Sequence, residues 1–330
     1  MIGNLIKRYF ESYFIAFPFN SGCNLVNIEL SKGNDSNKKK NNNYIRQKRK
    51  SKNKHEIIWI NNPHYYEYLF DPVNIEQITS TEKNIFISCS DGKIATILAG
   101  KKFETLRVGK EAVLDFNKEH FGKTRIKELI KAGLRYGKIK EYYYDNETAE
   151  NLEKFKSVCS HGDEPQIKCF FNDKLTGSNR LFIFENFTGS WLGALMLSEA
   201  PNKKIKTDLL LRRKDAPNGV METLIYGTFS RLKNEGFKLW SLGEVPYIIY
   251  DSRFFSKEFW INFIGRKTKF AYNYSGLFKF KNKFNPEWND VYICTKKRLN
   301  LFFLLRILVK SNLIVLVLYK SILLFSQFGI

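Results

Sequence analysis

The spacing of apolar residues along this 330-residue chain indicates short strands and amphipathic helices from about residue 57 onward. In the first half, strands are expected at 84–90, 93–98, 103–108 and 142–144. Helices are expected at 110–116, 123–134 and 147–157. Asp91-Gly92 lies between the first two strands, and this dipeptide predicts a hairpin turn. The first half is therefore expected to form a hairpin followed by helices.

The second half is predicted to run strand, strand, strand, helix, strand. The strands are expected at 180–186, 191–198, 205–212 and 237–242. The helix at 220–233 has apolar residues on one side, and Gly236 is its expected C-terminal stop. This order resembles the core of an acetyltransferase-type (GNAT-like) fold. We predict an α/β (α+β) chain of two fused GNAT-like lobes, at 56–150 and 151–298, with mixed sheets flanked by helices.

Both ends of the chain differ from this pattern. Residues 1–55 are expected to be an N-terminal extension, with helical spacing over 2–14 and a disordered basic linker. The linker has nine Lys or Arg and no acidic residue over 38–54, so it is either a solvated spacer or an electrostatic arm for tRNA or anionic membrane.

The C-terminal segment 299–330 is predicted to be an amphipathic helix that lies flat at a membrane interface. Arg306, Lys310 and Lys320 fall on one side of it, and the other sides are apolar. Its uncharged run over 311–319 is shorter than the roughly 20 residues needed to cross a bilayer. The alternative is a helix buried against the rest of the protein.

Charge and composition indicate which partners and metal ions the protein is expected to bind. The net charge of +21 favours acidic partners such as nucleic acid or anionic lipid. The five cysteines are scattered and never form CxxC, which argues against a disulfide framework and a zinc site and fits a reducing cytosol. The four histidines have no metal-binding spacing, and residues 1–19 lack the features of a secretory signal. We expect a cytoplasmic protein without a metal; the sequence leaves its oligomeric state open.

The segment 208–222 combines an apolar strand, a Pro-Gly turn and a helix start, with charged residues around the turn. Such a strand brings charges to a helix N-terminus, which is a common site for an anionic or polar ligand. In a GNAT-like core this turn normally holds the diphosphate of acetyl-CoA. Here the loop 214–219 has one glycine, and Pro217 lacks a backbone donor. A different activated acyl donor is therefore expected.

Three blocks of sequence carry a more specific resemblance. They read DLLLRRKDAPNGVMETL from Asp208, FKLWSLGEVP from Phe237 and YNYSGLFKFKNKFNPEWNDVY from Tyr272. Together they resemble the C-terminal catalytic domain of phosphatidylglycerol lysyltransferases, also called multiple peptide resistance factors. VGKEAVLDF at 108–116 and Arg135-Tyr136-Gly137 resemble the preceding lobe, so the likeness spans roughly residues 80–293.

This resemblance implies transfer of an aminoacyl group, lysyl in the named family, from aminoacyl-tRNA to a phospholipid such as phosphatidylglycerol. It implies no cofactor besides the aminoacyl-tRNA co-substrate, and a peripheral position on the inner face of the cell membrane. Two alternatives stay open. One is an aminoacyl-tRNA-dependent transferase that acts on a small molecule or peptide, and the other is a catalytically degenerate lipid- or RNA-binding protein.

The resemblance implies that Asp208, the acid of the family's D-L-M-R motif, holds the amine of the aminoacyl group. The alternative is a carboxylate in a surface salt bridge. The motif's arginine falls on Leu211, so Arg212 or Arg213 is the candidate replacement. In a regular extended strand Asp208 and Arg212 share one face, which favours Arg212.

Five further residues are candidates for the site. Glu244 follows a strand beside Gly and Pro and is a candidate acid, base or amine ligand, and Glu222 lies in a first helical turn. Lys279, Lys281 and Lys283 alternate with phenylalanines, a pattern typical of a half-buried strand. The resemblance makes these lysines candidates for contact with the tRNA acceptor end or a lipid phosphate. Asp215 and Asn218 are expected to cap the helix that follows.

Overall fold

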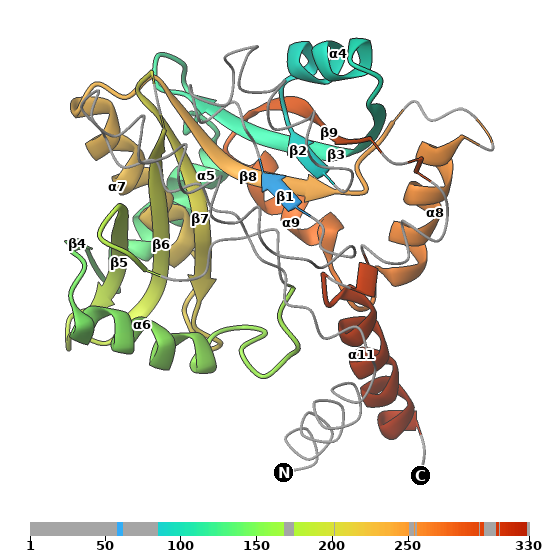
Figure 1. Ribbon diagram of the computed structural model, residues 1–330. Helices are drawn as coiled ribbons and strands as arrows, with labels where there is room; N and C mark the ends of the chain where they lie inside the picture. Colours follow the sequence, from blue (N-terminus) through green and yellow to red (C-terminus); the bar gives the residue numbers. More distant parts are fainter. Residues whose placement is uncertain are drawn as a thin grey trace.

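A computed structural model describes residues 58–61, 85–167, 175–200, 202–250, 254, 256–296, 298–299, 308–309 and 311–328. The expected helix over 2–14 and the basic linker lie outside the described residues. Figure 1 shows a central twisted sheet with helices around it. The strands are β1 (Ile58–Asn61), β2 (Ile85–Cys89), β3 (Glu104–Asp115), β4 (Gly137–Tyr142), β5 (Asn179–Asn186), β6 (Trp191–Ala200), β7 (Lys204–Arg212), β8 (Leu239–Pro246) and β9 (Glu287–Thr295). The helices are α4 (Gly92–Gly100), α5 (Thr124–Gly133), α6 (Asn146–Val158), α7 (Val220–Asn234), α8 (Lys257–Thr268), α9 (Tyr274–Asn282) and α11 (Leu313–Phe328).

The described strands form one nine-stranded sheet in the order β1-β2-β9-β3-β8-β7-β6-β5-β4. The pairs β1–β2 and β7–β8 are parallel, and the other neighbouring pairs are antiparallel. β3 lies between β8 and β9, although both of those strands come from the second half of the chain. β4 comes from the first half and pairs with β5. The two expected lobes therefore share one mixed sheet.

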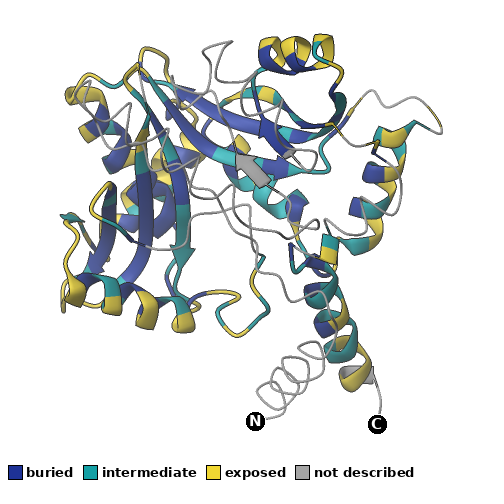
Figure 2. Cartoon of the chain, in the orientation of Figure 1, coloured by how far each residue is buried: buried dark blue, intermediate teal, exposed yellow. Residues whose placement is uncertain are grey.

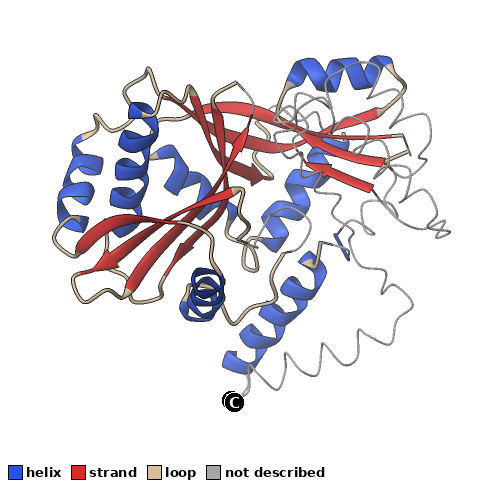
Figure 3. Ribbon diagram, turned by 60° about the vertical axis from the view of Figure 1, so that its left-hand side comes forward, coloured by secondary structure: helices blue, strands red, loops and turns tan. Residues whose placement is uncertain are grey.

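Helices cover both faces of this sheet (Figure 3). The main core packs α5, α7 and part of α9 against one face, with Trp240 and Phe284 fully buried in it. On the opposite face, Leu152 and Phe155 of α6 pack against β5, β6 and β7. Figure 2 shows the strands largely buried and the outer helix faces exposed. Burial on both faces explains why the strands of the second half could be recognised as apolar runs.

Several expectations for the first half are wrong, and the strand expected at 142–144 is one of them, because β4 spans Gly137–Tyr142. Residues 93–98 belong to helix α4 and not to a strand, and Asp91 accepts a hydrogen bond from the Lys93 amide at 2.8 Å as its N-cap. Asp91-Gly92 therefore starts a helix instead of closing a hairpin. Residues 110–115 continue β3 and are not helical. The reason is tertiary: β3 pairs along its length with β8 and β9.

The segment around the alternating lysines is also a helix, and not the half-buried strand that its pattern indicated. Asn273 caps α9 by accepting a hydrogen bond from the Gly276 amide at 2.9 Å. At about 100° per residue, a helix puts Lys279 and Lys283 on one side and Lys281 on another. In agreement, Lys279 is exposed while Lys281 is only 4% exposed.

Helix α11 has one end packed against the protein and one end exposed. Leu313 and Leu316 pack against Ala271, and Lys320 pairs with Glu164 at 2.5 Å. Further along, Phe325 is 77% exposed. The alternative of a buried helix therefore holds for the first part of α11 only. Among the described residues no helix is both long and apolar enough to cross a membrane.

Candidate functional site

The parallel pairing of β7 with β8 stops early, and this opens the sheet at the predicted site. The two strands pair over Lys204–Lys206 and Leu239–Ser241. Asp208 lies two residues beyond the last paired residue of β7, and Glu244 lies three residues beyond that of β8. α9 packs against β8 at this point. We call this region the β7–β8 fork, defined by 207–212 of β7 and 242–246 of β8.

Asp208 lies in a β-bulge on the α6 side of the sheet. Met196 pairs with Leu209 while Leu197 pairs with Thr207, so Asp208 is the extra residue of β7. Its Oδ2 accepts hydrogen bonds from Asn179 Nδ2 at 3.1 Å and from Ser198 Oγ. Asp208 is 7% exposed, so it is not the surface salt-bridge residue considered as the alternative. Burial raises the pKa of its carboxyl above the ordinary value, against the opposing effect of Lys206.

The bulge changes which arginine can accompany Asp208. Leu211 packs with the α6 cluster, on the side of Asp208, whereas Leu210 packs with the α7 cluster on the other side. By alternation Arg212 follows Leu210, and its Nη2 donates to the Ala216 carbonyl, which also belongs to the α7 side. The expectation that Asp208 and Arg212 share a face is therefore wrong. The family's arginine position, Leu211, does share the face of Asp208.

Arg213 is held away from Asp208. Its guanidinium forms an ion pair with Asp215 at 2.5 Å, beyond the end of β7. Arg213 is five positions along the chain from Asp208, which in an extended strand is about 16 Å between their Cα atoms. The structure therefore brings neither candidate arginine to Asp208. Asp215 does not cap α7 either, because the N-cap residue is Gly219 and makes no side-chain cap hydrogen bond.

For the aminoacyl transfer that the resemblance implies, we expect Asp208→Asn to lower the rate at least about 30-fold, because a desolvated charge partner of the substrate amine is worth more than about 2 kcal/mol. Since folding raises the pKa of Asp208, the folded state holds its proton more tightly, and stability falls as pH rises through that window. The amide avoids this cost. The variant should therefore unfold at the same or a higher urea concentration at pH 7.

The matched control is Asp215→Asn, which removes an exposed carboxylate paired with Arg213 and should leave the rate unchanged. Loss of stability in Asp208→Asn together with loss of activity would contradict a role in substrate binding and indicate a structural one.

Lys281 is the most perturbed cation of the described residues near the fork. Its ammonium donates to the backbone carbonyl of Glu244 at 3.0 Å, and a Cβ on Gly243 would lie 3.4 Å from its Nζ. Burial lowers the pKa of Lys281 to about 7, although the carboxylates of Glu244 and Glu111 favour the charged form. A lysine with this pKa can accept a proton at neutral pH. The resemblance implied that Lys281 contacts the tRNA acceptor end or a lipid phosphate, but its burial and lowered pKa suit proton transfer better.

Glu111 also belongs to the polar group around Lys281, but it was not predicted from the sequence. It is 1% exposed, and it accepts hydrogen bonds from Ser241 Oγ at 2.6 Å and from Ser90 Oγ at 2.5 Å. Its partners come from β8 and from the residue after β2, so no local pattern could have placed it. The only available signal was its position in the VGKEAVLDF block. Burial together with Glu244 also raises the pKa of Tyr272, to about 12.

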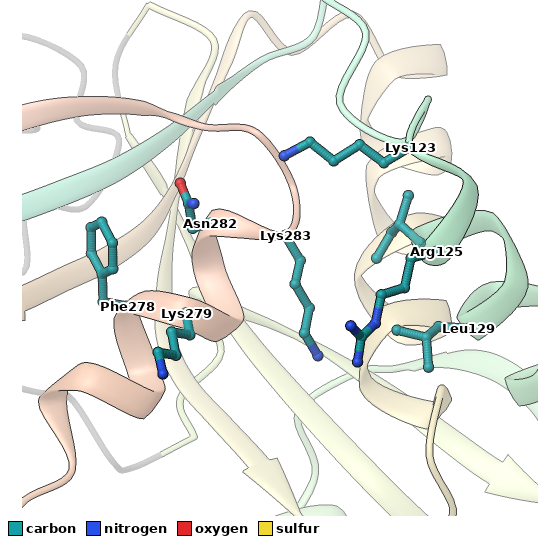
Figure 4. Close-up of a pocket in the computed structure, with 8 residues that line it drawn as sticks. Lys123, Arg125, Leu129, Phe278, Lys279, Asn282 and Lys283 are labelled. Carbon is teal, nitrogen blue, oxygen red and sulfur yellow. The ribbon is translucent and has the colours of Figure 1, made fainter.

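Lys283 and Glu222 form a second pair across the start of α7. Lys283 Nζ lies 2.7 Å from Glu222 Oε1, and Glu222 is 6% exposed. Lys279 and Lys283 line a pocket of about 280 Å³ between α9 and α5. Figure 4 shows Lys123 and Arg125 on the opposite wall of this pocket. The structure thus groups Lys279 with Lys283, and Lys281 with Glu244, on different sides of α9.

The first turn of α7 is covered by α5. A Cβ on Gly219 would lie 2.2 Å from the Leu129 carbonyl oxygen, and Thr223 Oγ1 donates to the Ile130 carbonyl at 3.0 Å. Backbone of α5 therefore packs directly against the turn at which a GNAT-like core normally accepts a diphosphate. In the described part of the chain, no group of three His, Cys, Asp or Glu is placed to hold a metal ion.

The mixed sheet and its flanking helices confirm the predicted α/β (α+β) class, and strands from both halves of the chain form one sheet. Residues 164–295 match the family described as phosphatidylglycerol lysyltransferase, C-terminal, which confirms the resemblance seen in the motifs. A phosphatidylglycerol lysyltransferase of Bacillus subtilis (strain 168) is 33% identical over 115 residues, which are 33% of this chain and 13% of that protein. The chain thus spans a small part of the curated relative it matches.

Two solved structures share the fold. L-PGS from Bacillus licheniformis has a TM-score of 0.58 and 18% identity, covering 72% of this chain and 75% of that one. The C-terminal domain of a putative lysylphosphatidylglycerol synthetase from Agrobacterium fabrum has a TM-score of 0.54 and 16% identity, covering 73% and 75%. The likeness therefore extends beyond the matched segment into the first half of this chain.

Proposed function

We propose that this protein transfers an aminoacyl group from aminoacyl-tRNA to the hydroxyl of a phospholipid such as phosphatidylglycerol. The observation that carries the proposal is the match of residues 164–295 to the lysyltransferase family, with Asp208 and Lys281 buried beside the fork. Transfer of lysine is the form of the reaction that the relatives' names suggest.

The chemistry assigns each group a simple task. Lys281, as a neutral amine, takes the proton of the lipid hydroxyl, whose oxygen attacks the carbonyl carbon of the aminoacyl ester. The bond from that carbon to the ribose oxygen of the tRNA breaks, and the ribose oxygen receives the proton. The carboxylate of Asp208 holds the ammonium of the aminoacyl group. An activated ester needs no further cofactor for this exchange, and positioning supplies much of the rate.

The covering of α7 by α5 supports a donor other than acetyl-CoA. The loop before α7 has a single glycine, and the carbonyl of Leu129 approaches it closely. A diphosphate needs several open backbone N–H groups at such a turn. The aminoacyl ester of tRNA requires no diphosphate site, so it fits this geometry better.

Exposed apolar residues support a peripheral position on the inner face of the cell membrane. On α11, Leu324 is 40% and Phe325 is 77% exposed. On α8, Trp260 is 47% exposed and Phe263 is 39% exposed, with Lys267 beside the Phe263 ring. Aromatic and basic residues together suit the headgroup region of an anionic bilayer.

We expect the double variant Leu324→Ser with Phe325→Ser to bind phosphatidylglycerol vesicles about tenfold more weakly in co-sedimentation. The reason is that losing one buried apolar side chain costs at least about 1.4 kcal/mol, which is tenfold in affinity. These substitutions spare Leu313 and Leu316, which pack against the protein and would be lost if 299–330 were deleted.

The control for this prediction removes two other exposed aliphatic side chains, Ile97 on α4 and Leu134 after α5, which are 51% and 55% exposed. Ile97→Ser with Leu134→Ser should bind vesicles as the wild type does. Equal binding by both double variants would contradict membrane contact through α11.

Incubation of the full chain with a set of charged tRNAs and phosphatidylglycerol vesicles tests the reaction directly. We expect an aminoacyl-lipid with at least one tRNA, detected by mass spectrometry. Absence of product with every tRNA would refute the lipid acceptor. Transfer to a soluble amine or peptide in the same assay would instead support the alternative transferase.

One observation favours a second candidate, a degenerate lipid- or RNA-binding protein. Leu211 occupies the position of the family's arginine beside Asp208, and Arg212 lies on the other face of the sheet. Activity of the wild-type chain that is abolished by Asp208→Ala would refute this candidate.

A further inference from the structure

The pocket between α5 and α9 is lined mainly by cations. Its volume is about 280 Å³, and four of its eight lining residues are Lys123, Arg125, Lys279 and Lys283. Figure 4 shows Arg125 and Lys283 extending toward each other across it. The first two cations come from the start of α5 and the last two from the end of α9. We call this the basic pocket.

The charge of the basic pocket is poorly compensated. No carboxylate lines it, and of the described carboxylates only Glu222 pairs with a lining cation, through Lys283 at 2.7 Å. Four cations around one cavity repel each other unless an anion lies between them. The planar guanidinium of Arg125 suits a phosphate, because it can donate two parallel hydrogen bonds to phosphate oxygens. A phosphate group is therefore the expected occupant.

One wall of the basic pocket offers an aromatic surface as well. Phe278 lines the pocket and stacks on Trp288, with ring centroids 4.6 Å apart and planes at 27°. Trp288 Nε1 donates to Asn282 Oδ1 at 3.3 Å, and Asn282 also lines the pocket. Cations that follow a backbone, combined with an aromatic platform for a base, are the usual means of binding single-stranded nucleic acid.

We propose that the basic pocket binds a nucleotide near the 3′ end of single-stranded RNA, with its phosphate among the four cations and its base against Phe278. That this RNA is the acceptor end of the donor tRNA rests on the proposed function. The phosphate and base chemistry comes from the pocket itself.

The position of α9 links the basic pocket to the reaction. α9 directs Lys279 and Lys283 to the pocket and Lys281 to Glu244 in the fork. An RNA end held in the pocket would therefore lie within about one helix diameter, about 10 Å, of Lys281. That separation suits the last nucleotides of a strand whose terminal ester reacts at the fork.

A lipid headgroup fits the basic pocket less well. Acyl chains would need a continuous apolar surface, but the apolar lining is limited to Ile126, Leu129 and Phe278. The exposed apolar end of α11 lies elsewhere: α11 packs beside Ala271, before the start of α9, whereas the pocket is at the end of α9. The nine residues of α9 separate these places by about 13 Å.

The test measures binding of a fluorescent single-stranded RNA of about eight nucleotides to the full chain by anisotropy. We expect Arg125→Glu and Lys279→Glu each to weaken binding about tenfold or more. Each should also reduce the slope of log affinity against log salt by about 0.7, the value for one lost phosphate contact on a single strand. Phe278→Ala should weaken RNA binding without changing the salt slope, since it removes stacking only.

The matched controls are Lys127→Glu and Lys131→Glu, which reverse exposed lysines on the same helix α5 outside the pocket. They should change RNA affinity less than twofold. Equal weakening by control and pocket variants would overturn the proposal, because binding would then depend on general charge. Weaker binding of phosphatidylglycerol vesicles with unchanged RNA binding would overturn it in favour of a lipid site.

The two proposals fail in different ways. RNA binding that depends on Arg125 but is accompanied by no aminoacyl-lipid would keep the pocket and refute the reaction. Wild-type rates of aminoacyl-lipid formation in Arg125→Glu, with unchanged RNA affinity, would keep the reaction and refute the pocket.

Discussion

Replacing Lys281 by methionine will lower the rate of aminoacyl transfer at least about 100-fold, the usual contribution of a positioned proton acceptor. Methionine fills similar volume but cannot take the proton of the acceptor hydroxyl. The wild-type rate should rise with pH through about 7, because burial lowers the pKa of Lys281 to that value and only the neutral amine is a base. When the rate of the variant is measured between pH 5.5 and 8.5, this rise with pH should be absent.

The pH dependence of the unfolding free energy distinguishes a role of Lys281 as proton acceptor from a purely structural role. Folding lowers the pKa of Lys281 from its ordinary 10.5, so the unfolded state binds more protons between about pH 7 and 10.5. The cost of burying this lysine is complete below pH 7 and is relieved as pH rises through that window. We expect wild-type stability to rise with pH by at most about 1.4 kcal/mol per unit relative to Lys281→Met.

The matched control is Lys279→Met, on the exposed side of the same helix. It should keep the pH profile and the stability of the wild type. If Lys281→Met lost activity only because it unfolded, the role as proton acceptor would be refuted, and urea unfolding at pH 7 detects this.

Gly219→Ala should destabilise the fold by more than about 3 kcal/mol. Gly219 has a φ of 93°, and its Cβ would lie 2.2 Å from the Leu129 carbonyl oxygen and 2.9 Å from the Gly133 amide nitrogen. Backbone strain at the positive φ contributes about 1–2 kcal/mol of this loss. The rest comes from the collision of the added Cβ with the backbone of α5. A lower urea midpoint with an unchanged m value would measure the loss.

Gly236→Ala measures the backbone strain without the collision. Gly236 has a φ of 80°, but no atom lies within 4 Å of a Cβ built there. We expect this variant to lose only the strain, about 1–2 kcal/mol. Equal losses at Gly219 and Gly236 would mean that α5 does not press on the start of α7, and the argument against a diphosphate at that turn would lose its support.

Local pattern was sufficient where a segment's neighbours agree with its own preference. The strands and helix of the second half follow the apolar runs because both sheet faces are covered, so burial and sequence coincide. The pattern failed at 110–115, where two partner strands extend β3, and at α9, whose alternating Phe and Lys suited a strand equally well. Neither partner strand nor packing helix is visible within a short window of sequence.

Some residues of the candidate site were also predicted from local sequence, and others were not. Asp208, Glu222, Glu244, Lys281 and Lys283 were found through motif blocks, and the structure places all of them near the fork or the start of α7. Glu111, Asn179 and Ser198 were missed, because each contacts the site from a strand distant in sequence. Lys123 and Arg125 were missed because an exposed cation at a helix start looks like any solvated residue.

The sequence by itself determined the α/β class, the family resemblance and the identity of the charged residues, because these depend on residue type and local spacing. Only the tertiary structure decided which of those residues act together. One extra residue in β7 turns Asp208 toward Leu211 and away from Arg212, and one helix turns Lys281 inward while Lys279 and Lys283 line the basic pocket. The physical reason is that strand register and helix packing decide on which face of the sheet or helix a side chain lies, and both are set by partners across the sheet.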